Sequence, residues 1–318
     1  MMRRSDPRRA GFTLIELLVV IAIIAVLMGL TTAAVMRALD VGPRADTTSR
    51  IAAINNAIGT FKSERSVPYI PGGQVQDDPA VPATYGTVVG PFRLRSSYTA
   101  MTTPNDISFE ARYIKRVFGN ATLDNLGDSG VTGNLDANQT LLFFLNGIPE
   151  TDGQGGFAFR GFSKNPQKPF NKLSAGEDRT RPYLDISNKH YTAPVNAGTT
   201  PNPNFPWLVD GWKRPFAYFA AFNGKPVKVP VAPATLTQYD GLNNQFVAPF
   251  VPGVQTTMGV PRAYFNGTRY ENESGFQILS AGKDGVFGTS GDWNNVSQPG
   301  QDDRANFSTS NLGAGPTK

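Results

Sequence analysis

The sequence predicts an α+β protein, in which a long N-terminal helix packs with its second half on an antiparallel sheet of three or four strands. Three observations support this prediction. Residues 12–30 are almost all apolar, residues 44–65 repeat apolar side chains at helical spacing, and short strand-like segments follow residue 207. The 33 Gly and 25 Pro residues among 318 indicate long loops between these elements.

The N-terminus joins a basic leader to an apolar segment of membrane-spanning length. Residues 1–11 contain four Arg and end at Gly11. The 19 residues 12–30 would form a helix of about 28 Å, close to the roughly 30 Å of a hydrocarbon core. The helix is expected to continue to about Leu39, which gives a hydrophobic transmembrane and assembly helix over 12–39.

Glu16 is the one charged residue between the leader and Arg37. A charge deep in a bilayer costs roughly 2.5–3.5 kcal/mol, and a plain membrane anchor has no use for it. Cleavage between Gly11 and Phe12 would place a new amino group four residues from Glu16. A helix N-terminus also favours a carboxylate in its first turn.

Gly11 followed by Phe-Thr-Leu-Ile-Glu resembles the class III signal of type IV prepilins and type II secretion pseudopilins. The resemblance implies that a prepilin peptidase cuts after Gly11 and methylates the amino group of Phe12. It also implies that Glu16 docks the subunit against the N-terminal amine of its neighbour in a filament. The alternative is an ordinary signal peptide or signal anchor, which needs no glutamate and usually ends in an A-x-A type site that is missing here.

Gly42-Pro43 is predicted to interrupt the helix, because proline lacks the N–H donor and clashes with the preceding turn. The helical pattern resumes over 44–65, with an apolar face made of Ile51, Ile54, Ile58 and Phe61. A helix lying on a membrane surface would have a Lys/Arg-rich polar face. The polar face here is mixed, so this amphipathic half is expected to pack on a globular core, as a similar half-helix does in pseudopilins.

Residues 66–206 are predicted to be a loop-rich insertion, about which the resemblance says little. Phe109, Tyr113 and Val117 suggest a short helix over 108–118. Asp136 could cap a second helix that ends before Gly147. The apolar run inside that second segment is equally compatible with a buried strand, since short runs do not separate the two.

Residues 207–318 are predicted to hold the antiparallel sheet and a C-terminal calcium-type loop. Strands are expected at 214–222, 262–270 and 275–280. Residues 210–218, Asp-Gly-Trp-Lys-Arg-Pro-Phe-Ala-Tyr, resemble the Asp-Pro-Trp-Gly-x-Pro-Tyr-x-Tyr segment that leads into a sheet strand in major pseudopilins.

Asp284 and Asp292 are eight residues apart, with three glycines between them. Calcium takes six to eight oxygen ligands, but an Asp-Gly pair is also common in ordinary turns. Residues 280–289 resemble the C-terminal calcium loop of major pseudopilins. That resemblance implies Asp284 and Asp292 as side-chain ligands of calcium and Ala281 as a carbonyl ligand. Further candidate ligands are Ser290, Asp302 and Asp303.

Composition argues against most enzymatic and nucleic-acid functions. The formal charge of +5 falls to +2 without the leader, which contains four Arg and one Asp, so no basic surface for nucleic acid is expected. The chain has no cysteine, and its one histidine, His190, stands in a polar loop and is expected at the surface. A Cys-His site is excluded, a Ser-His-Asp site would depend on His190 alone, and no phosphate-binding loop motif occurs. The protein is therefore predicted not to be an enzyme.

The absence of cysteine also leaves packing or a metal ion to hold the loops. Many type IV pilins have a C-terminal disulfide loop, so its absence favours the pseudopilin side of the resemblance. The expected function is a structural filament subunit of a type II secretion system, with no catalysis of its own. Its expected partners are further copies of itself, the prepilin peptidase and the inner-membrane assembly platform.

The resemblance places the chain in the inner membrane as a single-pass protein with its C-terminal domain in the periplasm. Two alternatives stay open. One is a type IV pilus subunit for adhesion, motility or DNA uptake. The other is a membrane-anchored binding protein that uses a prepilin-type signal.

Overall fold

The computed structural model describes residues 13–312, with gaps at 76, 78–87, 99–107, 129, 152–155, 172–177, 186, 188–189, 195–201, 226–260, 267–268, 289–290, 294–295 and 297–299. The chain divides into two units, Met1–Pro43 and Arg44–Lys318, which are described separately below. The boundary falls at the Gly42-Pro43 pair of the sequence.

Helix α1 runs from Leu14 to Arg65 without a break, and Pro43 lies inside it. The prediction that Gly42-Pro43 interrupts the helix is therefore wrong. A proline costs a helix roughly 3 kcal/mol because it removes one hydrogen bond and bends the axis, but long helical segments on both sides can tolerate that loss. The helix ends where Ser66 adopts a left-handed φ of 53° and the Val67 N–H donates to the carbonyl of Lys62 at 3.1 Å.

Two further α-helices follow, α2 (Phe109–Phe118) and α3 (Ala137–Asn146). Both were predicted from the sequence, and the helical alternative for the second is confirmed. Short 3₁₀ turns occur at Phe222–Gly224 and Gly300–Asp302. The strands are β1 (Gln74–Val75), β2 (Val88–Gly90), β3 (Phe92–Leu94), β4 (Gly133–Leu135), β5 (Pro149–Thr151), β6 (Phe157–Phe159), β7 (Tyr191–Thr192), β8 (Trp207–Leu208), β9 (Ala217–Ala220), β10 (Tyr264–Asn266), β11 (Arg269–Tyr270), β12 (Phe276–Ser280), β13 (Gly291–Asp292) and β14 (Arg304–Ala305).

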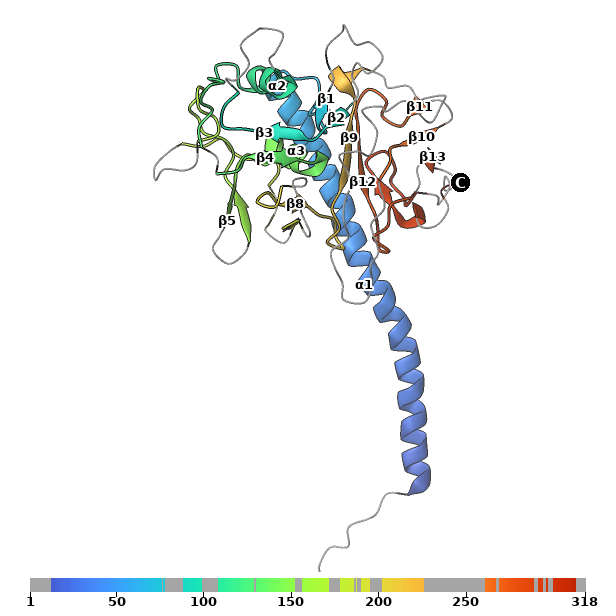
Figure 1. Ribbon diagram of the computed structural model, residues 1–318. Coiled ribbons are helices and arrows are strands. Elements are labelled where there is room, and N and C mark those ends of the chain that lie inside the picture. Colours follow the sequence, from blue (N-terminus) through green and yellow to red (C-terminus); the bar gives the residue numbers. More distant parts are fainter. Residues whose placement is uncertain are drawn as a thin grey trace, which may run out of the picture. The chain divides into compact units, whose positions relative to one another are not determined.

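The two longest strands described, β12 and β9, lie in an antiparallel sheet of the order β14-β12-β9, which confirms the predicted α+β class and the small sheet (Figure 1). Ile278 on β12 stands opposite Tyr218 on β9. The predicted strand 275–280 corresponds to β12, and the predicted strand 214–222 shortens to β9. The predicted strand 262–270 is instead a hairpin, because β10 turns back into β11 with Asn266 opposite Arg269.

The remaining strands pair in small sheets around this centre. β10 also pairs in parallel with β13, and four two-stranded antiparallel ladders join β1 to β2, β3 to β4, β5 to β6 and β7 to β8. Parallel pairing needs a long connection and leaves little local signal, so the sequence did not predict it.

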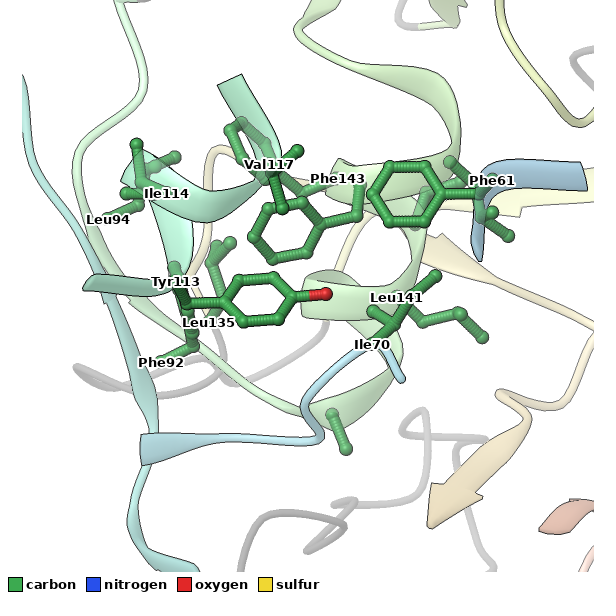
Figure 2. Close-up of a cluster of buried hydrophobic side chains, with 14 of the residues drawn as sticks. Phe61, Ile70, Phe92, Leu94, Tyr113, Ile114, Val117, Leu135, Leu141 and Phe143 are labelled. Atoms are coloured by element: carbon green, nitrogen blue, oxygen red, sulfur yellow. The ribbon is translucent and has the colours of Figure 1, made fainter. Parts of the chain in front are cut away.

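One hydrophobic core gathers the second half of α1, both shorter helices and the central sheet. It contains the whole predicted apolar face of α1, Ile51, Ile54, Ile58 and Phe61. Figure 2 shows Phe61 from α1 turned toward side chains of α2 and α3, among them Tyr113, Leu141 and Phe143. The prediction that this half of the helix packs on a core is confirmed. A second cluster, which includes Trp207, Phe219, Tyr264 and Leu279, fills the other side of the sheet.

Candidate functional sites

Glu16 lies in the first turn of α1 and is held there by Thr13. The backbone N–H and the hydroxyl of Thr13 each donate to Glu16 Oε2 at 2.8 Å, and the Glu16 N–H donates to Thr13 Oγ1 at 3.3 Å. These reciprocal bonds form a capping box, whose signature is Ser/Thr-x-x-Glu. Glu16 was predicted to be functional, and the Thr-x-x-Glu spacing also signals the capping role of Thr13, which was not predicted. The cap therefore holds the carboxylate at the N-terminal end of the helix.

The segment that follows, Leu14–Thr32, is 19 residues long, has a mean hydropathy of 2.8 and is not buried within the chain. Leu14 is 81% exposed and Leu30 is 68% exposed. A core helix of a soluble protein would bury these side chains, whereas a helix that is apolar all round needs lipid or other helices around it. A signal sequence meets the same criteria of length and hydropathy, and Gly11 and Phe12 lie outside the described residues.

In the C-terminal loop, the turn over residues 282–285 closes around Asp302. Asp302 Oδ2 accepts hydrogen bonds from the backbone N–H groups of Lys283 at 2.6 Å and Asp284 at 3.0 Å. Gly282 has a φ of 63°, and a Cβ there would lie 2.7 Å from Asp302 Oδ2. Only glycine suits this position, because it combines a left-handed conformation with a close approach. Partial burial and the neighbouring Asp302 carboxylate raise the pKa of Asp284.

Asp303 is buried beside this turn and is bound by two donors. Its Oδ2 accepts the hydroxyl of Tyr264 at 2.9 Å and the N–H of Gly288 at 3.0 Å. Burial raises the pKa of Asp303 well above its usual range, and the charges of Asp302 and Asp284 act in the same direction. The two adjacent acids are thus structural centres of the loop and not the solvated pair that adjacent acids usually are.

The structure brings Asp284 together with Asp302, while Asp292 lies on β13 in register with Phe265 of β10. Ala281 is buried directly after β12. Among the described residues, no three His, Asp or Glu side chains are grouped as metal ligands, and Ser290 lies outside them.

Asp302 Oδ1 and Asp303 Oδ1 are nevertheless buried without a hydrogen-bond partner in the part of the chain described. Buried polar atoms normally have a partner. Carboxylate oxygens are the ligands that calcium prefers, so the chemistry of these residues fits a calcium ion. Calcium binding, with Asp284, Asp292 and Ala281 among its ligands, stays a prediction.

Comparison with known proteins identifies the N-terminal segment. Residues 6–32 match the family model of the prokaryotic N-terminal methylation motif. No curated protein and no solved structure matches the chain. The match covers Gly11, Phe12 and Glu16 and shows a prepilin-type signal on a single apolar helix. It supports a membrane-anchored, single-pass subunit of the type IV pilin-like or pseudopilin kind in general, processed by prepilin peptidase.

Behind this signal, the second half of α1 is fixed to the 210–218 segment by Arg50. Arg50 is buried, donates to the carbonyl oxygens of Val209 and Asp210, and forms an ion pair with Asp46 one turn earlier. The Gly211 N–H donates to the hydroxyl of Thr47 at 3.0 Å. The segment singled out in the sequence therefore connects the helix to the globular core.

Asp210 organises the turn of that segment. Its Oδ1 accepts the N–H groups of Trp212 at 2.8 Å and Arg214 at 2.9 Å, and its Oδ2 accepts the hydroxyl of Ser280 on β12. Burial raises the pKa of Asp210 to about 6, against the lowering effect of these donors. One carboxylate thus joins the turn before β9 to the neighbouring strand of the central sheet.

His190 is buried, so the prediction of a surface histidine is wrong. Its carbonyl accepts the N–H of Val209 at 2.9 Å, which places it at the start of the β7–β8 ladder. Its Nε2 lies 3.9 Å from Asp46 Oδ1 on α1. The polar sequence around His190 gave no sign of this burial, because the covering residues come from distant segments.

Proposed function

We propose that this protein is a structural filament subunit, a pseudopilin, of a type II secretion system. In this proposal a prepilin peptidase cuts after Gly11 and methylates Phe12, and the subunit assembles from the inner membrane with its C-terminal unit in the periplasm. The observation that supports it most strongly is the methylation-motif match over residues 6–32 on a helix whose first turn presents Glu16. The secretion system, the periplasmic placement and the filament are proposals beyond that match.

The energetics of the N-terminus favour assembly. In a lone membrane helix, Glu16 faces lipid near the interface, where it is less costly than at the centre but still unfavourable. In a bundle of such helices, it can pair with the amino group of a neighbouring Phe12, and the attraction between opposite charges is stronger away from water. The exposed apolar side chains of Leu14–Thr32 exchange lipid for the same side chains of other copies.

A Glu16→Ala variant tests this role in the full chain. We expect signal cleavage and methylation at Phe12 to continue, as shown by mass spectrometry of the N-terminal peptide, while filaments disappear. Thr31→Ala is the matched control, because it removes a polar side chain from the same exposed span, where its hydroxyl bonds only to backbone carbonyls of α1. Normal filaments from Glu16→Ala would contradict the docking role.

Two observations would decide between the filament systems. Loss of protein secretion in a deletion strain, without loss of a surface fibre, supports the type II assignment. A fibre beyond the cell envelope that disappears with the gene supports the type IV pilus subunit. A membrane-anchored binding protein would keep its activity in the Glu16→Ala variant.

Calcium in the C-terminal loop is a second part of the proposal. It is supported by the unpartnered oxygens of Asp302 and Asp303 next to Asp284. When bound, the ion would neutralise these carboxylates and hold a loop that has no disulfide. We expect calcium to raise the melting temperature of the wild-type chain, and Asp284→Ala to lose that increase. The same measurement on Asp302→Asn and on Asp292→Asn then shows which of these two acids binds calcium together with Asp284. Equal melting temperatures with calcium and with a chelator in wild type would remove the metal from the proposal.

A further inference from the structure

A wide cleft lies between the polar face of α1 and the turn that joins β11 to β12. Its volume is about 900 Å³. Amide and carboxylate side chains dominate its lining: Asn55, Asn56, Glu271, Asn272, Glu273 and Asn306. Their oxygens accept hydrogen bonds, and the lining holds two carboxylates, Glu271 and Glu273, against one cation, Arg269, which gives a net charge of −1. The cleft therefore suits a partner that is rich in donors and positively charged.

Two side chains of the cleft, Glu271 and Asn55, are held by hydrogen bonds before any partner arrives. Glu271 Oε1 accepts the indole N–H of Trp293 at 2.7 Å. Glu273 lies 3.5 Å from Arg269, whose side chain is 78% exposed and can turn away. The side chain of Asn306 donates to Asn55 Oδ1 on α1 at 3.3 Å, so these two lining residues are joined. Little side-chain ordering remains to oppose binding at this surface.

Helix α2 presents a surface of the opposite character on the same unit. Its exposed face carries Arg112, Lys115 and Arg116 at i, i+3 and i+4, while its other face is buried in the core (Figure 2). The segment 88–118 holds five Arg or Lys against two Asp or Glu, a net charge of +3. One of those two acids, Glu110, is buried and accepts the N–H of Arg93 on β3.

The three cations differ in how they are engaged. Arg112 pairs with Asp77, and Lys115 donates to the carbonyl of Ala121 at 2.9 Å. No ion pair joins Arg116 to a carboxylate of the described residues. An exposed guanidinium can offer up to five N–H donors to carboxylate and amide oxygens. Arg116 is thus the natural anchor for an acceptor-rich cleft.

We propose that the basic face of α2 on one copy of this chain docks into the α1–β11–β12 cleft of a second copy. This inference rests on the proposed filament function and names the contact between globular units. The contact joins two different surfaces, so repeating it builds an open chain and not a closed two-fold dimer. Helix α2 is about 15 Å long and presents its three cations on one exposed face. Complementary charge sets the register of such a contact and makes it sensitive to salt.

Cysteine cross-linking tests the contact without background, because the chain has no cysteine. Lys115→Cys marks α2, and Ser274→Cys marks the cleft with a nearly isosteric change. The full-length double variant, expressed with the assembly machinery and treated with a short bis-maleimide, should give a ladder of multimers. Each single variant should stay monomeric. The pair Asp185→Cys with Ser274→Cys, both exposed positions, is the matched control and should give no ladder.

Charge exchange provides the second arm of the experiment. Arg116→Glu and Glu273→Arg should each lower the yield of multimers about tenfold, and the two together should restore it. Dimers from Lys115→Cys alone would indicate a two-fold contact at α2 and overturn the proposal. A ladder from the control pair, or no rescue by the exchanged charges, would also overturn it.

The two proposals fail in different ways. Wild-type filaments visible by electron microscopy, with only monomers after cross-linking of the double variant, would reject the docking and leave the filament function standing. A wild-type chain that forms no filament would reject the filament function and this contact with it. A ladder that disappears in a Glu16→Ala background supports both.

Discussion

The two halves of helix α1 show how one continuous helix can serve two different surroundings. In the span Leu14–Thr32 every described side chain is exposed, and the segment is apolar all round. From Arg44 to Arg65 the helix buries one face, including Ile54, Ile58 and Phe61, and exposes the other. A helix that is apolar on all sides requires lipid or other helices around it, and one with a single apolar stripe requires a core.

The two halves of α1 are therefore stabilised by different partners. The second half is stabilised within its own chain, by the core and by the hydrogen bond from Arg50 of α1 to the carbonyl of Asp210. The side chains of Leu14–Thr32 are exposed among the described residues, so we expect a bilayer or further copies to cover the first half. Substitutions in the two halves should therefore act on different measurements, folding for one and assembly for the other.

The largest expected effect on folding is that of Phe61→Ala. The Phe61 ring is fully buried, with ring centroids 6.0 Å from Phe144 and 5.3 Å from Tyr183. Its loss should lower the free energy of unfolding by about 3–5 kcal/mol. Urea unfolding of the detergent-solubilised chain measures this, because all three Trp residues lie beyond residue 206 and report on the globular unit.

The matched control for Phe61→Ala is Leu17→Ala in the first half of the helix. Leu17 is 60% exposed, so its truncation should change the same unfolding energy by less than about 0.5 kcal/mol. A loss as large as that of Phe61→Ala would show that the apolar span also stabilises the globular unit, and the comparison between the two halves would not hold.

A smaller effect concerns pH and belongs to the globular unit. Asp136 is the N-cap of α3, bound by the Gln139 N–H at 2.8 Å and the Trp207 indole N–H at 2.6 Å. Burial raises the pKa of Asp136 to about 7, so the folded state retains a proton that the unfolded state releases near pH 4. The stability gained from protonation is complete below about pH 4 and is lost as the pH rises to about 7. Asp210, with a pKa of about 6, acts in the same direction.

Urea unfolding at a series of pH values checks this. Asp136 alone should cost the wild-type chain roughly 3 kcal/mol between pH 4 and 7, because its pKa rises from about 4 to about 7 and each pKa unit corresponds to about 1.4 kcal/mol. Asp136→Asn should reduce the dependence to the part that comes from Asp210, while keeping the helix cap, since Asn is also a good N-cap. The helix content of the first half of α1 should not change over the same pH range. An unchanged slope in the variant would assign the pH dependence to other groups.

The sequence predicted those features that depend on neighbours along the chain. The short helix over 108–118, the cap Asp136 and the apolar face of α1 all depend on spacings of a few residues, and the structure confirms them. The hairpin of β10 and β11 was also within reach, because Asn266-Gly267 is a strong hairpin signal that the prediction of one long strand ignored.

The features that the sequence could not predict depend on contacts between distant segments. The residues next to His190 in the sequence give no sign that α1 and the 207–210 segment lie against it. Asp302 was only one of several further candidates beside Asp284, because eighteen residues separate the two and only folding brings them together. Loops that are rich in Gly and Pro make such contacts without periodicity, so their local sequence does not reveal them.

The smallest expected effect is that of Pro43→Ala, at the boundary between the two units. Because α1 is already continuous through Pro43, the helix content measured by circular dichroism should hardly change. The alanine introduced at position 43 supplies an N–H that can bond four residues back, so hydrogen exchange should slow in residues 40–46. The free energy of unfolding of the globular unit should change by less than about 0.5 kcal/mol, since no core side chain is touched. A change of more than about 1 kcal/mol would mean that Pro43 prevents the first half of the helix from affecting the stability of the globular unit. In that variant, the surroundings of the first half would influence the stability of the second half. The different effects of substitutions in the two halves, on assembly and on folding, would then depend on Pro43 alone.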